Sequence, residues 1–361
     1  MPEKTCIQVG GQAVVEGVMM RSPKGLAVAV LRANGEIVVR ESPWRSYAER
    51  WAWLKWPFLR GAVVLLESLS NGINALQFSA QIAFDEENKT QSGQPDGQPD
   101  GQPDGQAKKP EGGAEMVTWL MVAVSVALGL GLFVALPHLI VWFGSWLMGR
   151  QLTVQQFLFH VLVGGVKFGV FVGYIALISR MEDIRRVFMY HGAEHQAIHT
   201  YEQGEDLTVD NARRYSPLHA RCGTTFLILV IAVSIVVFSV VFPPLIWAIG
   251  EPTRFGWLNQ VIFILIKVPL LFPVAGLAYE LQKWTSRHLD QRWARALAWP
   301  GMALQRMTTR PPTDRQLEAA LASLQVVLWR ERVGVEPGKG IEEKVTVYPD
   351  YPTLVQKLAQ G

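Results

Sequence analysis

Four long apolar segments limit what this 361-residue chain can fold into. Each has few charged residues and is close to the roughly 20 residues that an α-helix needs to cross a bilayer. The mean hydropathy of the whole chain is also positive, which is unusual for a soluble protein. We therefore predict an α-helical integral membrane protein with about four transmembrane helices, at residues 117–138, 157–179, 224–246 and 258–279.

The connections between these segments differ in positive charge. The connections at Arg150 and Arg254 each carry one positive residue, whereas the 180–221 connection and the segment after the fourth apolar stretch are rich in them. Positive residues concentrate on the cytoplasmic side of a membrane. We therefore predict a multipass membrane protein, with both rich segments and both termini in the cytoplasm. The residues concerned are Arg180, Arg185, Arg186, Arg213, Arg214, Arg221, Lys283, Arg287, Arg292 and Arg295.

Composition argues against several other classes of protein. The net charge is only +3 and the basic residues flank the apolar segments, so we expect the lipid bilayer as a partner and no nucleic acid. Cys6 and Cys222 are far apart in unlike surroundings, which argues against a disulfide framework and favours a reduced setting. No basic segment followed by an apolar one begins the chain, so we expect no cleaved signal peptide.

Two lysines lie near the middle of predicted spans. An ammonium group at that depth is costly unless it has a partner or faces a wet cavity. Lys167 and Lys267 have no carboxylate in the four spans, and Glu67 and Glu280 are the nearest candidates. One alternative is an anionic ligand or lipid headgroup near the two lysines. The other is snorkelling or an internal hydrogen-bond network.

The N-terminal part is predicted to hold two regions. Residues 1–43 form a small β-rich cytoplasmic domain, because alternating residues flank an Asn34-Gly35 turn and predict a β-hairpin. Residues 44–84 begin with tryptophans interleaved with basic side chains, a composition typical of the membrane interface.

An apolar helix is predicted over residues 61–84. A crossing there would carry the basic residues before it outside, so we predict that the helix is interfacial, re-entrant or packed on the bundle. We expect its polar stripe to face inward. The stripe consists of Glu67, Ser70, Asn71, Asn74, Gln77 and Gln81.

The remaining chain is predicted to form three regions. Residues 85–115 contain a Gly-Gln-Pro-Asp repeat and form a disordered linker. Residues 116–280 form the transmembrane domain, with a histidine-rich cytoplasmic connection at 181–223, and residues 281–361 form a cytoplasmic C-terminal region. A capping pattern at 313–316 precedes an apolar helical stripe, which we expect to dock on the rest of the protein. The stripe is Leu317, Leu321, Leu324, Val327 and Leu328.

The histidine-rich connection carries the strongest chemical signal. His191, His195 and His199 are spaced four residues apart, so on a helix they share one face, and Glu202 returns to it. His191-x-x-Glu194-His195 is also the inverted zinc-protease pattern.

Two imidazoles one helical turn apart can share a divalent metal ion, most naturally zinc. His191 and His195 have this spacing, and the third ligand is expected from His219 or Cys222, or from His199 or Glu202. Glu194 would then act as general base. Arg221 would stabilise developing negative charge. The competing interpretation is that the histidines serve a hydrogen-bond network or bind lipid phosphate.

Several motifs resemble the YqhQ-like family of bacterial multipass membrane proteins. They lie at residues 10–23, 190–195, 219–226, 275–280 and 300–309, and the resemblance covers nearly the whole chain except the Gly-Gln-Pro-Asp repeat. It implies a metal-dependent enzyme, a label that itself rests on the His-Gly-Ala-Glu-His motif. A lysine, Lys267, stands where an arginine is expected in relatives. The residues to which the resemblance points are Glu16, Arg21, Glu67, His191, Glu194, His195, His199, Glu202, His219, Cys222 and Glu280.

These observations lead to alternative functions. The first is a membrane-embedded metal-dependent enzyme, a hydrolase, with a cytoplasm-facing His/Glu/Cys site. The second is a non-enzymatic assembly or biogenesis factor that docks a protein partner, with the histidines structural. A transporter is a third option, suggested by the lysines, although the sequence shows no inverted repeat.

Overall fold

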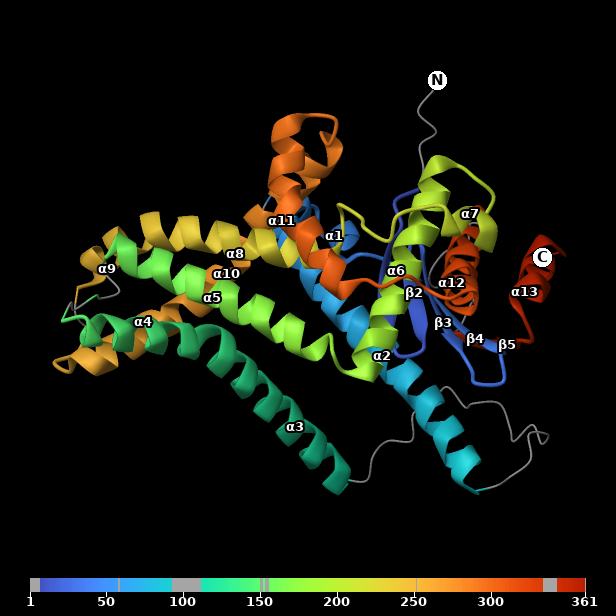
Figure 1. Cartoon of the computed structure of the whole chain (residues 1–361), viewed down its shortest axis with the longest axis horizontal. Coiled ribbons are helices and arrows are strands. Elements are labelled where there is room, and N and C mark those ends of the chain that lie inside the picture. The colour runs from blue at the N-terminus through green and yellow to red at the C-terminus, as the bar shows by residue number, and fades with distance from the viewer. Residues whose placement is uncertain are drawn as a thin grey trace.

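The computed structural model describes residues 7–57, 59–92, 112–149, 152, 156–250, 252–333 and 343–360. Long apolar helices extend to one side, and a β-sheet with its covering helices lies at the other (Figure 1). The Gly-Gln-Pro-Asp repeat lies outside the described residues. Helix α2 runs on to Ser92 and helix α3 begins at Gly112, so both helices extend into the range 85–115 that was predicted as linker.

The sheet has five antiparallel strands in the order of the chain. The predicted hairpin is present, with Leu31 opposite Ile37, and Gly35 adopts the positive φ of 91° that such a turn requires. The sheet is not confined to the N-terminal region, because β5 pairs Val347 with Val38. The strands are β1 (Gly10–Val14), β2 (Gly17–Arg21), β3 (Gly25–Leu31), β4 (Ile37–Pro43) and β5 (Lys344–Tyr348).

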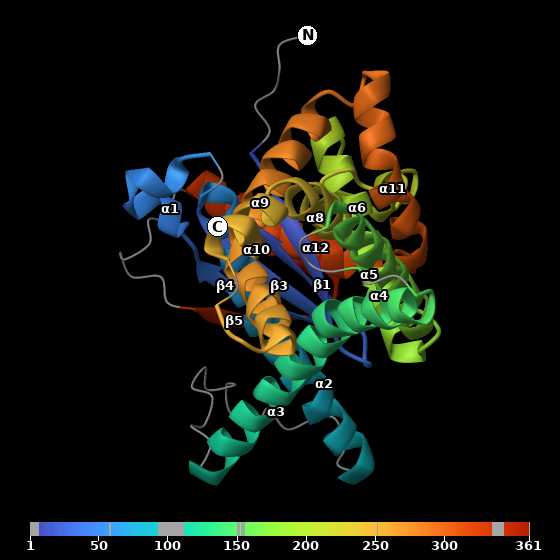
Figure 2. The ribbon, with the colours of Figure 1, turned by 90° about the vertical axis from the view of Figure 1, so that its left-hand side faces the viewer.

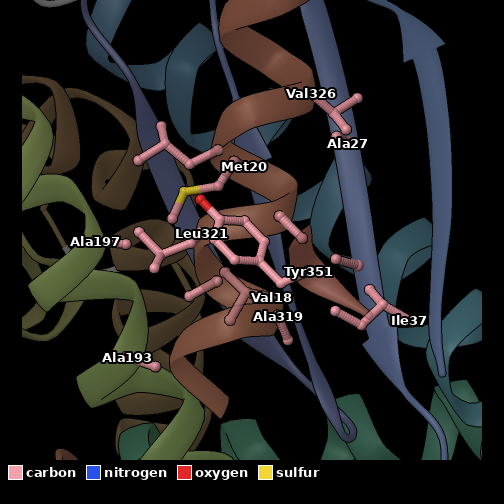
Figure 3. Packing of buried hydrophobic residues seen from close by; sticks show 14 of the residues in the cluster. Val18, Met20, Ala27, Ile37, Ala193, Ala197, Ala319, Leu321, Val326 and Tyr351 are labelled. Carbon is pink, nitrogen blue, oxygen red and sulfur yellow. The ribbon is translucent and has the colours of Figure 1, made fainter. Parts of the chain in front are cut away.

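Side chains on one face of the sheet pack under two helices, α6 (Glu182–Gln203) and α12 (Asp314–Val333). Val18 and Met20 of β2 point to this core, where they meet Leu321 of α12 and Ala193 of α6 (Figure 3). Four residues of the predicted stripe are fully buried, and Leu328 packs beside them. The predicted docking face is therefore confirmed. The C-terminal helix α13 (Tyr351–Gln360) adds Tyr351 and Leu354 to the core.

The other face of the sheet packs against α2 (Leu59–Ser92). Because alternate strand residues point to opposite faces, Met19 and Val28 meet Ala75 and Ile82 of this helix. Among the described residues, α2 is not one of the helices apolar enough to span a membrane. The end of α2 and the start of α3 project from the same side of the molecule in both ribbon views (Figure 2).

The predicted inward stripe of α2 is largely wrong. Glu67 is buried and Asn71 is half-buried, but the other members are exposed. The packed face consists of small and apolar residues because the sheet and α10 (Gly256–Arg287) lie close. Gly72, for example, leaves room for the side chain of Gln12. The exposed members are Ser70, Asn74, Gln77 and Gln81.

Four helical stretches among the described residues are long and apolar enough to cross a membrane, which matches the predicted number. Most of their side chains are not buried inside the protein, so their apolar surface requires an apolar solvent. The first stretch runs on beyond its predicted end, because α3 (Gly112–Leu130) continues through η2 (Gly131–Ala135) into α4 (Leu136–Leu147). The stretches are Ala123–Leu147, Phe157–Ile178, Gly223–Val240 and Leu258–Arg287.

Lys267 is buried among these helices, and no carboxylate in the described ranges pairs with it. Its ammonium group donates to His138 Nε2 at 2.9 Å and to His160 Nδ1 at 3.3 Å, and it lies 4.9 Å from the ring centre of Phe242. Glu67 instead accepts hydrogen bonds from Ser46 Oγ and the Tyr47 amide, and Glu280 pairs with Arg60. Lys267 therefore lies in an internal hydrogen-bond network, and neither predicted carboxylate pairs with it.

Short elements complete the fold. The aromatic-basic segment forms α1 (Tyr47–Arg50) and η1 (Ala52–Lys55), with Trp51, Trp53 and Trp56 exposed. Helix α9 (Phe242–Ile249) caps the far end of α8 (Gly223–Val240), which packs against α5 (Phe157–Ile178) and α10. Helix α11 (Arg292–Thr308) packs on α8 and leads to α12, while α7 (Val209–Arg213) packs against α6 and α12.

Candidate metal centre

Helix α6 holds most of the histidine-rich sequence. It ends at Gly204, whose left-handed conformation (φ 71°) closes the last turn. Its middle is buried between the sheet and α12, with Ala193 and Ala197 in the core. The four-residue spacing therefore presents His191, His195 and His199 along one side of α6, where the 215–222 segment runs past.

His191, His195 and Cys222 form the first group of donors. One ligand atom from each lies within 4.8 Å of the others. The Nε2 atom of His191 is 3.2 Å from Cys222 Sγ, and the two imidazole centres are 4.5 Å apart. Of the alternatives for a third ligand, Cys222 is therefore the one that joins the His191–His195 pair.

Main-chain carbonyls orient both imidazoles. His191 Nδ1 lies 2.8 Å from the Thr308 carbonyl oxygen, and His195 Nδ1 lies 2.5 Å from that of Pro217. Since a carbonyl only accepts, each Nδ1 carries the proton and each Nε2 keeps its lone pair. Metal-ligating histidines are typically held in this way.

Gly192 permits this arrangement. A β-carbon at this position would overlap the carbonyl oxygen of Arg310. Arg310 lies two residues after Thr308, whose carbonyl accepts a hydrogen bond from His191. The glycine in the His-Gly-Ala-Glu-His motif therefore lets the 308–310 backbone lie against α6.

His199, Glu202 and His219 form a second group, also with ligand atoms within 4.8 Å of one another. In this group the imidazole nitrogens make hydrogen bonds with other parts of the protein. His219 Nδ1 accepts from the Arg221 amide at 3.3 Å, so its Nε2–H faces Glu202 at 3.4 Å. Arg221 pairs with the same carboxylate. The second group is therefore a hydrogen-bond network, with His199 donating through Nε2 to the Leu218 carbonyl at 2.9 Å.

Two glutamines that the sequence analysis missed position the 219–222 segment. Gln305 of α11 accepts from the His219 amide and donates to the His219 carbonyl, both at 2.8 Å. Gln282 of α10 donates to the Cys222 carbonyl at 2.9 Å. Gln305 lies in one of the family-like motifs, at 300–309, but neither its residue type nor its spacing predicts a contact with His219.

Burial controls the protonation of these groups. Desolvation lowers the pKa of His195 well below its ordinary value and that of His219 to about 4, so both are neutral at pH 7. Desolvation also raises the pKa of the Cys222 thiol, opposed by hydrogen bonds from Thr224. Neutral imidazoles are the form that binds metal, and a thiol binds as the thiolate.

Glu194 faces the same space. Burial raises the pKa of its carboxyl to about 8, and His191 opposes this shift. A β-carbon on Gly11 of β1 would lie 2.6 Å from Glu194 Cγ, so this glycine makes room for the Glu194 side chain. No hydrogen bond reaches the Glu194 carboxyl from any side chain or amide in the described ranges.

A cavity of about 560 Å³ adjoins the first group. His191, Glu194, His195 and Cys222 lie in its wall, together with Arg221. Cavities of this size hold small organic ligands. The first donor group therefore has one side open to a space large enough for a small ligand.

Comparisons with known proteins agree with the resemblance found in the sequence. The model of a family described as "Protein of unknown function (DUF1385)" matches residues 56–330. The uncharacterized protein YqhQ of Bacillus subtilis (strain 168) is 30% identical over 335 residues, which is 91% of this chain and 95% of that protein. This chain belongs to that family. No solved structure matches it significantly.

Proposed function

We propose that this protein is a membrane-embedded metal-dependent hydrolase. The observation that carries the proposal is the convergence of His191, His195 and Cys222 beside a cavity, with one ligand atom from each within 4.8 Å of the others. Two imidazoles and one thiolate are suited to zinc, with a fourth position left for water or substrate.

The neighbouring side chains suit hydrolysis. A bound zinc ion would supply Lewis acidity and lower the pKa of a water molecule. Glu194 lies beside the ligands and would accept the proton from that water, because a nearby cation lowers the pKa of a carboxyl that burial has raised. Arg221 lines the cavity and would stabilise negative charge that develops on the substrate.

We place this site on the cytoplasmic side of the membrane. The arginines and lysines that flank α6 and follow α10 support this orientation. A reduced compartment would also keep Cys222, which is free and buried, available as a thiolate ligand.

Metal analysis of the detergent-purified protein tests the proposal. We expect about one zinc-class ion per chain in the wild type and a strong loss in His191→Ala and His195→Ala. Glu194→Gln should retain the metal, because Glu194 is not a ligand. Absence of any transition metal from wild-type protein purified without chelators would contradict the proposal.

A second candidate function is an assembly or biogenesis factor. The exposed tryptophans of η1 and its flanks favour it, because Trp51, Trp53 and Trp56 leave more than half of their surface uncovered. In this case Glu194→Gln should support growth as well as the wild type in a strain that lacks the gene, and cross-linking should recover a stable protein partner.

A further inference from the structure

The cavity beside the first donor group has a wall of mixed chemistry. The donors, Arg21 and Arg221 contribute polar and charged groups to it. Helices α2 and α8 contribute apolar side chains, Val64, Leu65, Phe226 and Leu227. A ligand that fills the whole cavity must therefore combine a polar end with a hydrocarbon end.

Arg21 marks the cavity as a site for an anion. This residue is the last of β2, lines the cavity, and has its guanidinium 4.5 Å from the ring centre of Trp44. Its Nη1 atom is buried and has no hydrogen-bond partner in the described part of the chain. Burial lowers the pKa of Arg21, partly offset by the charge of Glu67. A buried guanidinium nitrogen without a partner is costly, and an anionic group would satisfy it.

A helix N-terminus also favours negative charge in the cavity. Gly223 and Thr224, the first residues of the 18-residue helix α8, lie in its wall. The positive end of this helix dipole therefore lies at the cavity. Arg221 lines the same cavity, although its charge is shared with Glu202.

The apolar side chains of α8 in the wall belong to a segment that is apolar enough to cross a bilayer, because Phe226 and Leu227 lie in it. Leu227 lines the cavity and is also 44% exposed. A hydrocarbon chain in the cavity would therefore lie against the end of this apolar segment.

We propose that the ligand of this cavity is an anionic amphiphile, with a carboxylate or phosphate held by Arg21 and a hydrocarbon chain lying along α2 and α8. This inference rests on the proposed function where it makes the amphiphile the substrate of the hydrolase. Binding of the amphiphile depends only on the cavity and Arg21. Binding and hydrolase activity can therefore be tested separately.

Photo-cross-linking tests the binding step directly. Diazirine-bearing forms of dodecyl phosphate, dodecanoate and dodecanol are photolysed with the full-length protein in phosphatidylcholine nanodiscs, and modified peptides are mapped by mass spectrometry. We expect the anionic probes to label the α2 and α8 cavity residues about ten- to hundredfold more strongly than the alcohol does, the ratio given by one charged hydrogen bond.

Substitutions at Arg21 supply the controls. Arg21→Gln should reduce labelling by the anionic probes to the level of dodecanol, and Arg21→Lys should restore part of it. Arg45→Gln is the matched control, because Arg45 is exposed outside the cavity wall. Melting temperature and metal content of each variant separate lost binding from lost folding.

The outcomes separate the inference from the proposed function. Stronger labelling by phosphate or by carboxylate supports the inference and identifies the headgroup. Equal labelling by dodecanol, or unchanged labelling in folded Arg21→Gln, overturns it. Arg21-dependent labelling of a protein that contains no metal would support the amphiphile site and overturn the hydrolase.

Discussion

Cys222 has two roles at once, and they can be separated. Its sulfur is a proposed metal ligand, and it also caps helix α8 by accepting a hydrogen bond from the Thr224 amide at 3.4 Å. Serine is a good helix cap but a poor zinc ligand. The structural and metal-binding roles of this residue should therefore respond differently to one substitution.

We expect Cys222→Ser to keep its thermal stability within about 1 kcal/mol of the metal-free wild type. It should lose most of its metal affinity, and its cobalt-substituted form should lack the sulfur-to-cobalt absorption band. Calorimetry of the metal-free proteins and cobalt titration measure the two effects. An unchanged cobalt spectrum would mean that Cys222 is not a ligand.

Glu194 makes a prediction about pH. Burial raises the pKa of its carboxyl from 4.5 to about 8, so the folded, metal-free protein holds this proton more tightly than the unfolded chain does. The contribution of this group to stability is therefore full below pH 4.5 and is lost as the pH rises toward 8.

The substitution Glu194→Gln cannot ionise, so the metal-free variant should melt a few degrees above the metal-free wild type at pH 8 and show a weaker pH dependence. Glu182→Gln is the control, because Glu182 is an exposed glutamate at the start of the same helix. Parallel melting curves for wild type and Glu194→Gln across this pH range would contradict the assignment of Glu194 as a buried, desolvated acid.

At the scale of the element, the close contact between α6 and the 308–310 backbone is the most sensitive point of the site. Gly192→Ala would drive a methyl group into the Arg310 carbonyl. We expect it to destabilise the protein by about 1–3 kcal/mol, the usual cost of overpacking, and to lower metal occupancy by displacing the Thr308 carbonyl from His191.

Gly165→Ala in helix α5 is the matched control. A β-carbon there meets no atom within 4 Å, so its stability and metal content should equal those of the wild type. Thermal melting and metal analysis of the two variants test the contact. Equal melting temperatures and metal contents for Gly192→Ala and Gly165→Ala would show that α6 can move away from the 308–310 backbone, which contradicts the close packing.

Some elements could be predicted from sequence because their signals are local. The Asn34-Gly35 hairpin, the apolar stripe of α12 and the number of apolar spans all follow from periodicity and length. Strand β5 could not be predicted, because its pairing with β4 joins residues about 300 positions apart. The prediction that the polar stripe of α2 faces inward was wrong, because the sequence does not show that the sheet covers the opposite side of this helix.

The same limit applies to the site. The spacing of His191 and His195 placed them on one face of a helix, which the structure bears out. The choice between Cys222 and His219 as their neighbour depends on hydrogen bonds from Gln305, Gln282 and main-chain carbonyls. Those contacts join segments far apart in sequence, and no local pattern records them.

At the scale of the whole molecule, the site lies where the sheet, α6, α2 and the ends of the membrane helices α8 and α10 meet. Under the proposed function, this position would admit ligands both from a bilayer and from water. The proposed orientation puts the sheet and the metal-binding group in the cytoplasm, and the connection between α9 and α10 outside.

Engineered cysteines test this orientation in a Cys6→Ser background. Pro252→Cys lies between α9 and α10, and Asp290→Cys lies between α10 and α11; both positions are exposed. A membrane-impermeant maleimide should label Pro252→Cys in intact spheroplasts and Asp290→Cys only after lysis. The reverse pattern would put the metal-binding group outside the cell.

The central claim is that His191, His195 and Cys222 share one metal ion, and X-ray absorption at the zinc edge of the purified protein tests it most directly. The account predicts imidazole nitrogens at about 2.0–2.1 Å together with a single sulfur at about 2.3 Å. Zinc surrounded only by nitrogen and oxygen, or wild-type protein without bound metal, would contradict it.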